Sequence, residues 1–227
     1  MMITCAFALA KAQQRDTSTI HRTKLNVETP IQYGLGYEGR IYKNWNGVFQ
    51  VGFLTEPNST LVLNVLESFG VEQSVVLMIE DAFESGLVLE QGINYNLKRS
   101  YFGIFAQQYF LRGSDTPTEL VEDAMGEDLS QYPRLQNRIN SKDEAIELKS
   151  NLYQLGVLYG YRLPLKNQLE LNFELAISAN LGSQSSVSSD ERNYNDLSKR
   201  MDVYLGDIYR RYGYVPSITV AFVRKFR

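Results

Sequence analysis

Several residue types that organise other classes of protein are scarce in this 227-residue chain. It contains one cysteine, one histidine, one tryptophan and six prolines. Cys5 lies close to the N-terminus, so no disulfide framework is available to the remainder of the chain. His21 is the only candidate for the histidine base on which most serine-dependent and water-activating hydrolases rely. We therefore expect no catalytic residues, no bound metal and no cofactor, and hence a protein that is not an enzyme.

Long apolar runs and clusters of positive charge are also missing. No stretch approaches the roughly 18 apolar residues that a membrane-spanning helix needs. The 23 Lys and Arg residues are outnumbered by 26 Asp and Glu residues, which gives a formal net charge of -3. Because neutralising phosphates requires a dense basic stripe, nucleic acid is excluded as a partner. Tyrosine and phenylalanine are abundant instead, at 15 and 11 residues, and both favour β-strands.

The stretch YGLGYEGRIY, residues 33–42, places Gly34, Gly36 and Gly39 in the spacing of a dinucleotide-binding loop. Such a loop requires a helix that begins at the glycines, because the helix N-terminus holds the pyrophosphate. Alternating residues and the turn pair Asn46-Gly47 follow here, which predicts a β-hairpin. Because Gly34 and Gly36 fall on the polar face of a strand, the motif indicates no cofactor.

The first residues resemble the end of a secretory signal peptide. An apolar stretch is followed by Ala10-Lys11-Ala12, a small-x-small cleavage pattern, so we assign residues 1–12 to the signal and 13–30 to an N-terminal arm. The alternative is a lipoprotein signal that uses Cys5, but Met2 stands where such signals usually carry leucine. An ordinary signal-peptide cysteine is the simpler interpretation.

A period of two dominates residues 31–227, which we assign to a single β-domain. The clearest example is QLELNFELAISANL, residues 168–181, in which leucine, phenylalanine and isoleucine alternate with polar side chains. Similar segments occupy residues 33–42, 48–54, 86–97, 151–163 and 217–226. Residues 101–113 carry apolar side chains at both parities, and the short turn LKRS before them favours a strand there as well. These segments predict antiparallel hairpins.

The polar face of these segments carries charges of both signs and several glycines. Glycines are costly in an exposed strand unless crowding requires small side chains, and a narrow barrel lumen gives that reason. Opposite charges can also pair across such a lumen. We expect Glu170 and Glu174 to face Arg40, Arg162 or Lys225 across this interior. The predicted lumen charges are Glu38, Arg40, Glu90, Arg162, Glu170, Glu174 and Lys225.

Short and long connections alternate between the strands. YKNWNG, LKRS and PLKNQ are short turns, whereas residues 56–85, 114–149 and 183–214 are long connections. Membrane barrels show this pattern, with tight periplasmic turns and extended outer loops. Helical spacing predicts amphipathic insertions at about 59–85 and 194–213. The second long segment is acidic without EF-hand spacing, which is typical of a solvated loop rather than of a cation site.

The number of strands does not follow directly from the pattern. About seven segments are visible, whereas single-chain bacterial barrels have an even number of strands. An eighth strand is expected in residues 17–27, 61–78 or 201–214. Aromatic residues near strand ends predict interfacial girdles. They are Tyr42, Tyr95, Tyr101, Tyr161 and Phe226.

Three stretches carry a resemblance to a known group of proteins. GLGYEGRIYKNWNGVFQVGFLTEP, GLVLEQGINYNLKRSYFGIFAQQYF and YLGDIYRRYGYVPSITVAFVRKF resemble the small outer-membrane β-barrel proteins of Bacteroidota-type bacteria. The likeness lies in strand patterning and in the terminal segment. It implies a fold and a location, and it supplies no active-site residues.

These observations predict an all-β fold, an antiparallel transmembrane β-barrel of about eight strands with short amphipathic helices in the long connections. We expect the barrel in the outer membrane of a Gram-negative bacterium, with a structural, binding or small-solute passage role. The expected partners are outer-membrane lipids and, through the outer loops, an envelope protein or small ligand. The alternative is an exported soluble β-barrel or sandwich around a hydrophobic ligand, because alternation alone does not say which face meets water.

Overall fold

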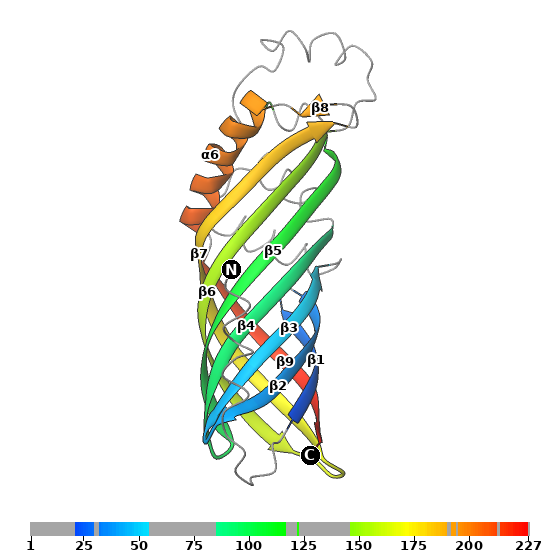
Figure 1. Ribbon diagram of the computed structural model, residues 1–227, viewed down its shortest axis with the longest axis vertical. Helices are drawn as coiled ribbons and strands as arrows, with labels where there is room; N and C mark the ends of the chain where they lie inside the picture. The colour runs from blue at the N-terminus through cyan, green and yellow to red at the C-terminus, as the bar shows by residue number, and fades with distance from the viewer. Residues whose placement is uncertain are drawn as a thin grey trace.

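The computed structural model describes residues 21–29, 32–54, 85–116, 122, 146–189, 192–193, 195–212 and 214–226. Within them, eight antiparallel strands close into a barrel, which confirms the predicted fold class (Figure 1). The strands of the ring are β1 (His21–Thr29), β2 (Gln32–Tyr42), β3 (Trp45–Leu54), β4 (Ser85–Leu97), β5 (Ser100–Thr116), β6 (Ile146–Pro164), β7 (Leu169–Ser189) and β9 (Tyr214–Phe226). The two-residue strand β8 (Arg192–Asn193) pairs with β7, and the helix α6 spans Asn195–Tyr212.

The ring is built almost entirely from pairs of strands that follow one another in sequence. Strands β1 to β7 pair in order, β9 pairs with β7, and β1 pairs with β9 to close the barrel. His21 lies opposite Phe226 in this closing pair. The N-terminal and C-terminal strands therefore complete each other's backbone hydrogen bonds, and the ring has no free edge over the height of β9.

Strand β1 supplies the eighth member of the barrel. It lies inside the segment 13–30 assigned to an arm, and it overlaps the first of the three ranges proposed for the missing strand. Of the other two ranges, 61–78 lies outside the described residues, and 201–214 is mostly helix α6. Arg22, Lys24, Asn26 and Glu28 alternate with less polar residues along β1, so the strand has the same two-faced pattern as its neighbours.

The first hairpin exists as predicted, but its turn lies elsewhere. The loop residues are Lys43 and Asn44, between the paired residues Tyr42 and Trp45, and not Asn46-Gly47. Asn46 belongs to β3 and points into the barrel, where its amide hydrogen-bonds to Glu38. The need for this buried partner outweighs the general preference for an Asn-Gly turn.

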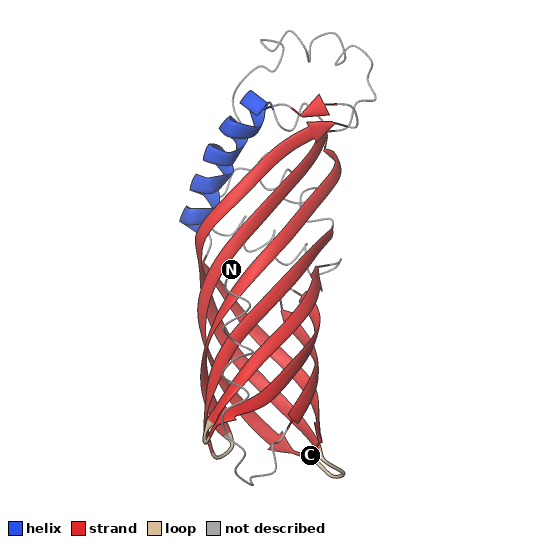
Figure 2. Cartoon of the chain, in the orientation of Figure 1, coloured by secondary structure: helices blue, strands red, loops and turns tan. Residues whose placement is uncertain are grey.

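Strands β5, β6 and β7 rise well beyond the rest of the barrel. They contain 17, 19 and 21 residues, whereas about 9 to 11 residues suffice to cross a bilayer. Helix α6 lies beside β7 in this upper part (Figure 2). The predicted helical insertion at 194–213 is thus present as α6. The apolar-polar alternation recognised in β7 ends at Leu181, but the strand continues through the serine-rich residues 182–189.

Helix α6 covers the edge that β7 exposes above the start of β9. The Asp202 carboxylate accepts a hydrogen bond from the Ser185 amide at 2.6 Å. The Ser198 hydroxyl accepts from the Val187 amide at 2.9 Å and donates to the Val187 carbonyl at 3.1 Å. These contacts satisfy backbone groups of β7 that lie between its pairing with β9 and its pairing with the two-residue strand β8.

Other expectations fall outside the described residues. The signal peptide at 1–12, nearly all of the helical insertion at 59–85 and most of the acidic segment between β5 and β6 belong to this group. Among the residues that are described, no helix is long and apolar enough to cross a bilayer.

Candidate functional site

A network of ion pairs occupies the barrel interior near the short turns. Glu38 on β2 lies at its centre and is completely buried. Its Oε1 atom accepts hydrogen bonds from Arg162 Nη2 at 2.7 Å and from Arg22 Nη1 at 3.1 Å. Lys24 Nζ lies 3.7 Å from the other carboxylate oxygen. Three cations from β1 and β6 therefore surround one buried carboxylate.

Two further carboxylates on β7 extend the network around the ring. Glu170 accepts from Arg22 Nε at 3.1 Å and pairs with Lys225 Nζ at 2.9 Å. Glu174 accepts from Lys24 Nζ at 2.9 Å and from the Tyr101 hydroxyl. Counting each side chain once, Glu38, Glu170 and Glu174 face Arg22, Lys24, Arg162 and Lys225, which is three carboxylates against four cations. Charges this deeply buried are tolerated because they are paired.

The structure places six of the seven predicted lumen charges in contact with other interior side chains. The expected contact between Glu170 and Lys225 is present, whereas Arg162 pairs with Glu38 rather than with a glutamate of β7. Glu90 lies higher in the lumen, where it accepts a hydrogen bond from Gln107 Nε2 at 2.7 Å. Arg40 is half-buried beside a register shift at the end of β2.

Sequence reasoning missed two of the four cations, Arg22 and Lys24. Both lie on β1, which had been assigned to the arm before the first recognised strand. The segment RTKLNVE carries the signal that finds them, because its charged and amide side chains alternate with Thr23, Leu25 and Val27. The exposed fractions follow that alternation, with Lys24 at 4% and Leu25 at 59%.

Aromatic side chains of β5 fill the lumen next to the charges. Tyr101 was predicted to lie in an interfacial girdle, but it is completely buried inside the barrel. Its ring covers Gly160, and the guanidinium carbon of Arg162 lies 4.2 Å from the ring centroid. Phe105, two inward positions further along β5, covers Gly156 in the same way. The apolar residues at both parities of β5 thus have separate roles, one set inside and one set outside.

The upper part of the barrel has an apolar interior. Helix α6 contributes Met201, Leu205 and Tyr209, all of them buried. The Tyr209 hydroxyl donates to Ser150 Oγ at 3.3 Å, and burial raises the pKa of Tyr209 to about 12. The strand residues buried in the same upper region include Leu54, Val88, Leu111, Leu148, Leu152 and Val187. This largely apolar cluster lies above the polar network.

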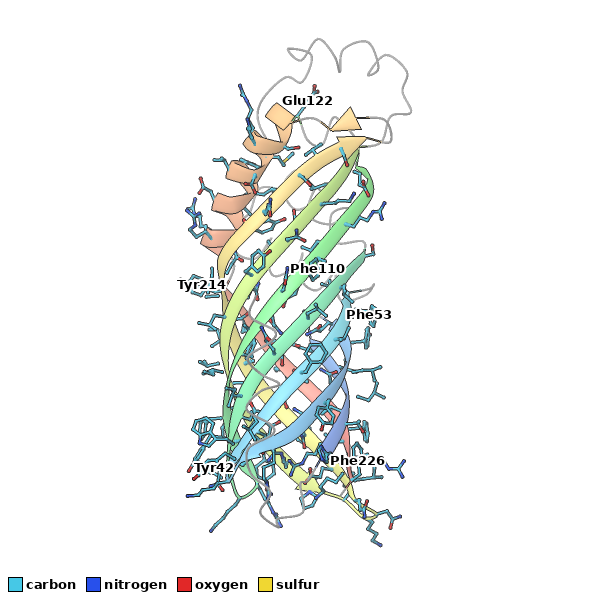
Figure 3. The ribbon with its side chains drawn as sticks, viewed as in Figure 1. Tyr42, Phe53, Phe110, Glu122, Tyr214 and Phe226 are labelled. Carbon is cyan, nitrogen blue, oxygen red and sulfur yellow. The ribbon has the colours of Figure 1, made fainter. Side chains whose placement is uncertain are left out.

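The outer surface of the barrel shows the opposite pattern. Leu35, Ile104 and Leu175 are 62%, 58% and 57% exposed, although they lie in the middle of their strands. Tyr42 and Phe226 lie at the end with the short turns, and Phe53 and Tyr214 lie about halfway up the molecule (Figure 3). A belt of apolar side chains surrounds this lower half, and the polar side chains of the same strands point inward. A water-soluble barrel has the reverse arrangement.

His21, the single histidine, lies on this outer surface. It is the first residue of β1, hydrogen-bonds through Nδ1 to the Tyr37 hydroxyl, and stacks against Phe226 with ring centroids 6.4 Å apart. It does not contact the buried carboxylates of the lumen. In the described part of the chain, no group of three His, Cys, Asp or Glu side chains is arranged to hold a metal ion.

Comparison with known proteins gives few likenesses. No family model matches the chain, and no curated protein matches it. A major outer membrane protein from Thermus thermophilus is similar in structure, with 13% identity, a TM-score of 0.48, and coverage of 92% of this chain and 100% of that one. CarO of Acinetobacter baumannii has 5% identity, a TM-score of 0.37 and coverage of 94% and 100%. CarO2 of the same organism has 8% identity, a TM-score of 0.37 and coverage of 92% and 98%.

Proposed function

We propose that this chain is an integral β-barrel of the Gram-negative outer membrane that is closed to solutes and has a structural or binding role. The observation that carries the proposal is the inverted burial of the lower barrel. Apolar side chains there face outward on all eight strands, while carboxylates, amides and ammonium groups are buried. Such an apolar outer surface is favourable in contact with a lipid bilayer and unfavourable in contact with water. Export through residues 1–12 is part of the proposal.

The contents of the lumen favour a plugged barrel over a pore. An eight-stranded barrel encloses only enough space for its own side chains. Here Glu38 and Tyr101 are fully buried near the short turns, and Leu54 and Leu148 are 1% and 2% exposed in the upper part. A solute would have to displace both the paired charges and the apolar cluster. Of the three roles open from the sequence, passage is therefore the least supported.

The absence of catalysis is part of the same proposal. The lumen carboxylates Glu38, Glu170 and Glu174 are each engaged by cations, and the histidine is on the outer wall. The upper extension of β5, β6 and β7 with α6 offers a polar outer surface above the apolar belt. In this proposal, that extension is the part of the protein that contacts an envelope protein or small ligand.

Conductance across a planar lipid bilayer tests the closed state. Purified protein is folded in detergent and added to one side of the membrane, with a known open porin as the positive control. We expect no discrete conductance steps. Removing part of the plug in a Tyr101→Ala, Phe105→Ala double variant leaves the upper apolar cluster in place, so this variant is also expected to stay closed. Regular steps from the wild-type protein would contradict the closed barrel while leaving its membrane location intact.

A further inference from the structure

The end of the barrel with the short turns carries a ring of exposed positive charge. Lys43 lies in the β2–β3 turn, Lys98 and Arg99 form the β4–β5 turn, and Lys166 lies in the β6–β7 turn. All four side chains, which we call the basic rim, are exposed. Residues 42–45, 97–100 and 165–168 include no Asp or Glu, and no carboxylate in the described part of the chain pairs with the rim.

Two of these lysines occupy backbone positions that do not suit lysine. Lys43 has a φ of 39° and Lys98 a φ of 55°, and each is the first residue of a two-residue hairpin loop. Loops of this kind usually place glycine, asparagine or aspartate where φ is positive, because a larger side chain is strained there. Turn geometry therefore does not account for lysine at these two positions.

The backbone joins the turns to neighbouring strand ends. The Asn96 amide donates to the Asn44 carbonyl at 2.8 Å, which ties the β2–β3 turn to the end of β4. The Arg162 amide donates to the Arg99 carbonyl at 2.8 Å, which ties the β4–β5 turn to β6. These bonds hold Lys43, Lys98 and Arg99 on one fixed edge of the barrel rather than on independent loops.

An apolar groove of about 610 Å³ opens on the outer wall beside this edge. Its lining includes Trp45, Tyr95, Phe102, Ile104, Val157 and Leu175. The rings of Trp45 and Tyr95 lie with centroids 5.0 Å apart at the rim end of the groove. Trp45 is two residues from Lys43, and Phe102 is three residues from Arg99. The Lys43 ammonium lies 5.1 Å from the centroid of the Tyr42 ring, so it stays level with the aromatic belt.

We propose that the basic rim and this groove together bind an anionic phospholipid. The phosphate contacts Lys43, Lys98 and Arg99, and one acyl chain lies in the groove between the aromatic side chains. This inference rests on the proposed membrane location, in which the short turns face the periplasmic leaflet. Cations alone would suit any polyanion, including the cell-wall polymer, but a groove with an aromatic entrance on the bilayer-facing wall fits a lipid.

The single tryptophan provides a direct probe, because Trp45 lines the groove. Acyl chains brominated near their midpoint quench tryptophan fluorescence only at close range. We would insert the protein into phosphatidylcholine vesicles that contain either brominated phosphatidylglycerol or brominated phosphatidylcholine at equal mole fraction. The proposal predicts much stronger quenching by the anionic lipid and a loss of this preference as salt is raised.

Substitutions assign the preference to the rim. In K43Q/K98Q/R99Q the relative affinity for phosphatidylglycerol should fall by about tenfold. The matched control K149Q/K199Q/R210Q removes two lysines and one arginine from β6 and α6, away from the short turns, and should keep the wild-type preference. Salt dependence in the wild-type protein gives the same information if the rim variant does not fold.

Equal quenching by the two lipids in the wild-type protein would overturn the proposal. An unchanged preference in a folded rim variant would also overturn it and would favour another anionic contact. If neither brominated lipid quenches Trp45 at all, the protein is not in the bilayer, and the proposed function fails instead. The two failures are therefore distinguishable.

Discussion

Inside the barrel, the ring of Tyr101 on β5 lies over Gly160 on β6, its direct partner in the strand register. A Cβ atom added to Gly160 would overlap that ring. Phe105 and Gly156 repeat the relationship four residues along each strand. The glycines of the lumen are thus explained by the side chains of the neighbouring strand that occupy their space.

Gly160→Ala should therefore destabilise the barrel, although alanine is normally better than glycine in a strand. We expect a loss of about 1 to 3 kcal/mol in the free energy of unfolding, typical of an overfilled core. Gly182→Ala is the matched control on β7, because no atom lies within 4 Å of the Cβ position there. Urea unfolding in lipid vesicles measures both variants. If Gly160→Ala and Gly182→Ala were equally stable, the ring of Tyr101 would not be the reason that residue 160 is glycine.

The paired charges of the lumen predict that removing one partner of an ion pair destabilises the barrel more than removing both. Lys24→Met removes a cation that contacts Glu174 at 2.9 Å and Glu38 at 3.7 Å, and its side chain is only 3% exposed. Loss of one partner from a buried ion pair costs about 3 to 5 kcal/mol, because it leaves charge without compensation. Adding Glu174→Gln should recover a large part of this loss. Urea unfolding that gives the double variant no advantage over Lys24→Met would contradict the network.

A surface pair provides the control for that experiment. Arg210 and Asp207 lie 3.6 Å apart on α6, and both side chains are 75% exposed. Exposed pairs of this kind contribute little to stability. Arg210→Ala should leave the urea midpoint unchanged.

The outward apolar belt predicts a position-dependent effect along β7. Phe173→Arg places a cation on the bilayer-facing wall, where arginine costs about 2 to 4 kcal/mol near the midplane. Ser186→Arg changes the same strand above the belt, where residue 186 is exposed and polar. We expect the first variant to lose membrane insertion and the second to insert normally, as measured by flotation with lipid vesicles. Normal insertion of Phe173→Arg would show that residue 173 does not face the bilayer, which contradicts the account.

The upper extension predicts a pH effect at Glu147. Lys149 Nζ lies 2.8 Å from its carboxylate, and Arg112 pairs with it as well. The hydrogen bond from Lys149 holds the pKa of Glu147 below its ordinary value. Because the folded-state pKa is lowered, the contact stabilises the extension above the unfolded-state pKa of about 4.3, and the effect is lost as pH falls through the folded-state value.

Carboxyl chemical shifts followed by NMR measure this titration directly. The midpoint for Glu147 should lie below about 4.3 in the wild-type protein and should rise in Lys149→Gln. The contact is on the surface, so the accompanying change in stability is small. An identical midpoint in the two proteins would show that Lys149 does not set the pKa.

The two faces of each strand could be predicted from the sequence, because side chains alternate between the lumen and the outer wall of the barrel. Leu175 and Glu174 were separated correctly by parity alone, as were Phe49 and Gln50. Helix α6 was also predictable, since Met201 and Leu205 recur at helical spacing. The continuation of β7 was not, because residues 182–189 lack the apolar alternation that identified its lower half. Above the belt the outer face is polar, so the signal disappears.

The contacts within the lumen needed the structure. Residues 101–113 carry apolar side chains at both parities, so parity did not place Tyr101, and its position at a strand end suggested an interfacial girdle. The structure shows that its ring fills the space left by Gly160 inside the barrel. Arg162 on β6, one of the partners of Glu38, lies 124 residues from it in the sequence. Arg22 lies directly opposite Glu38 in the register of β1 with β2, and the pairing of β1 with β9 completes the ring around both.

Heat-dependent mobility in a denaturing gel tests the central claim most directly. The outer-membrane fraction is extracted in detergent and run with and without boiling, because a closed barrel with paired backbone groups resists SDS until it is heated. We predict that the unheated protein migrates separately from the boiled protein and that both are found in the membrane fraction. A folded monomer recovered from the soluble fraction without detergent, and with no heat-dependent shift, would contradict the account.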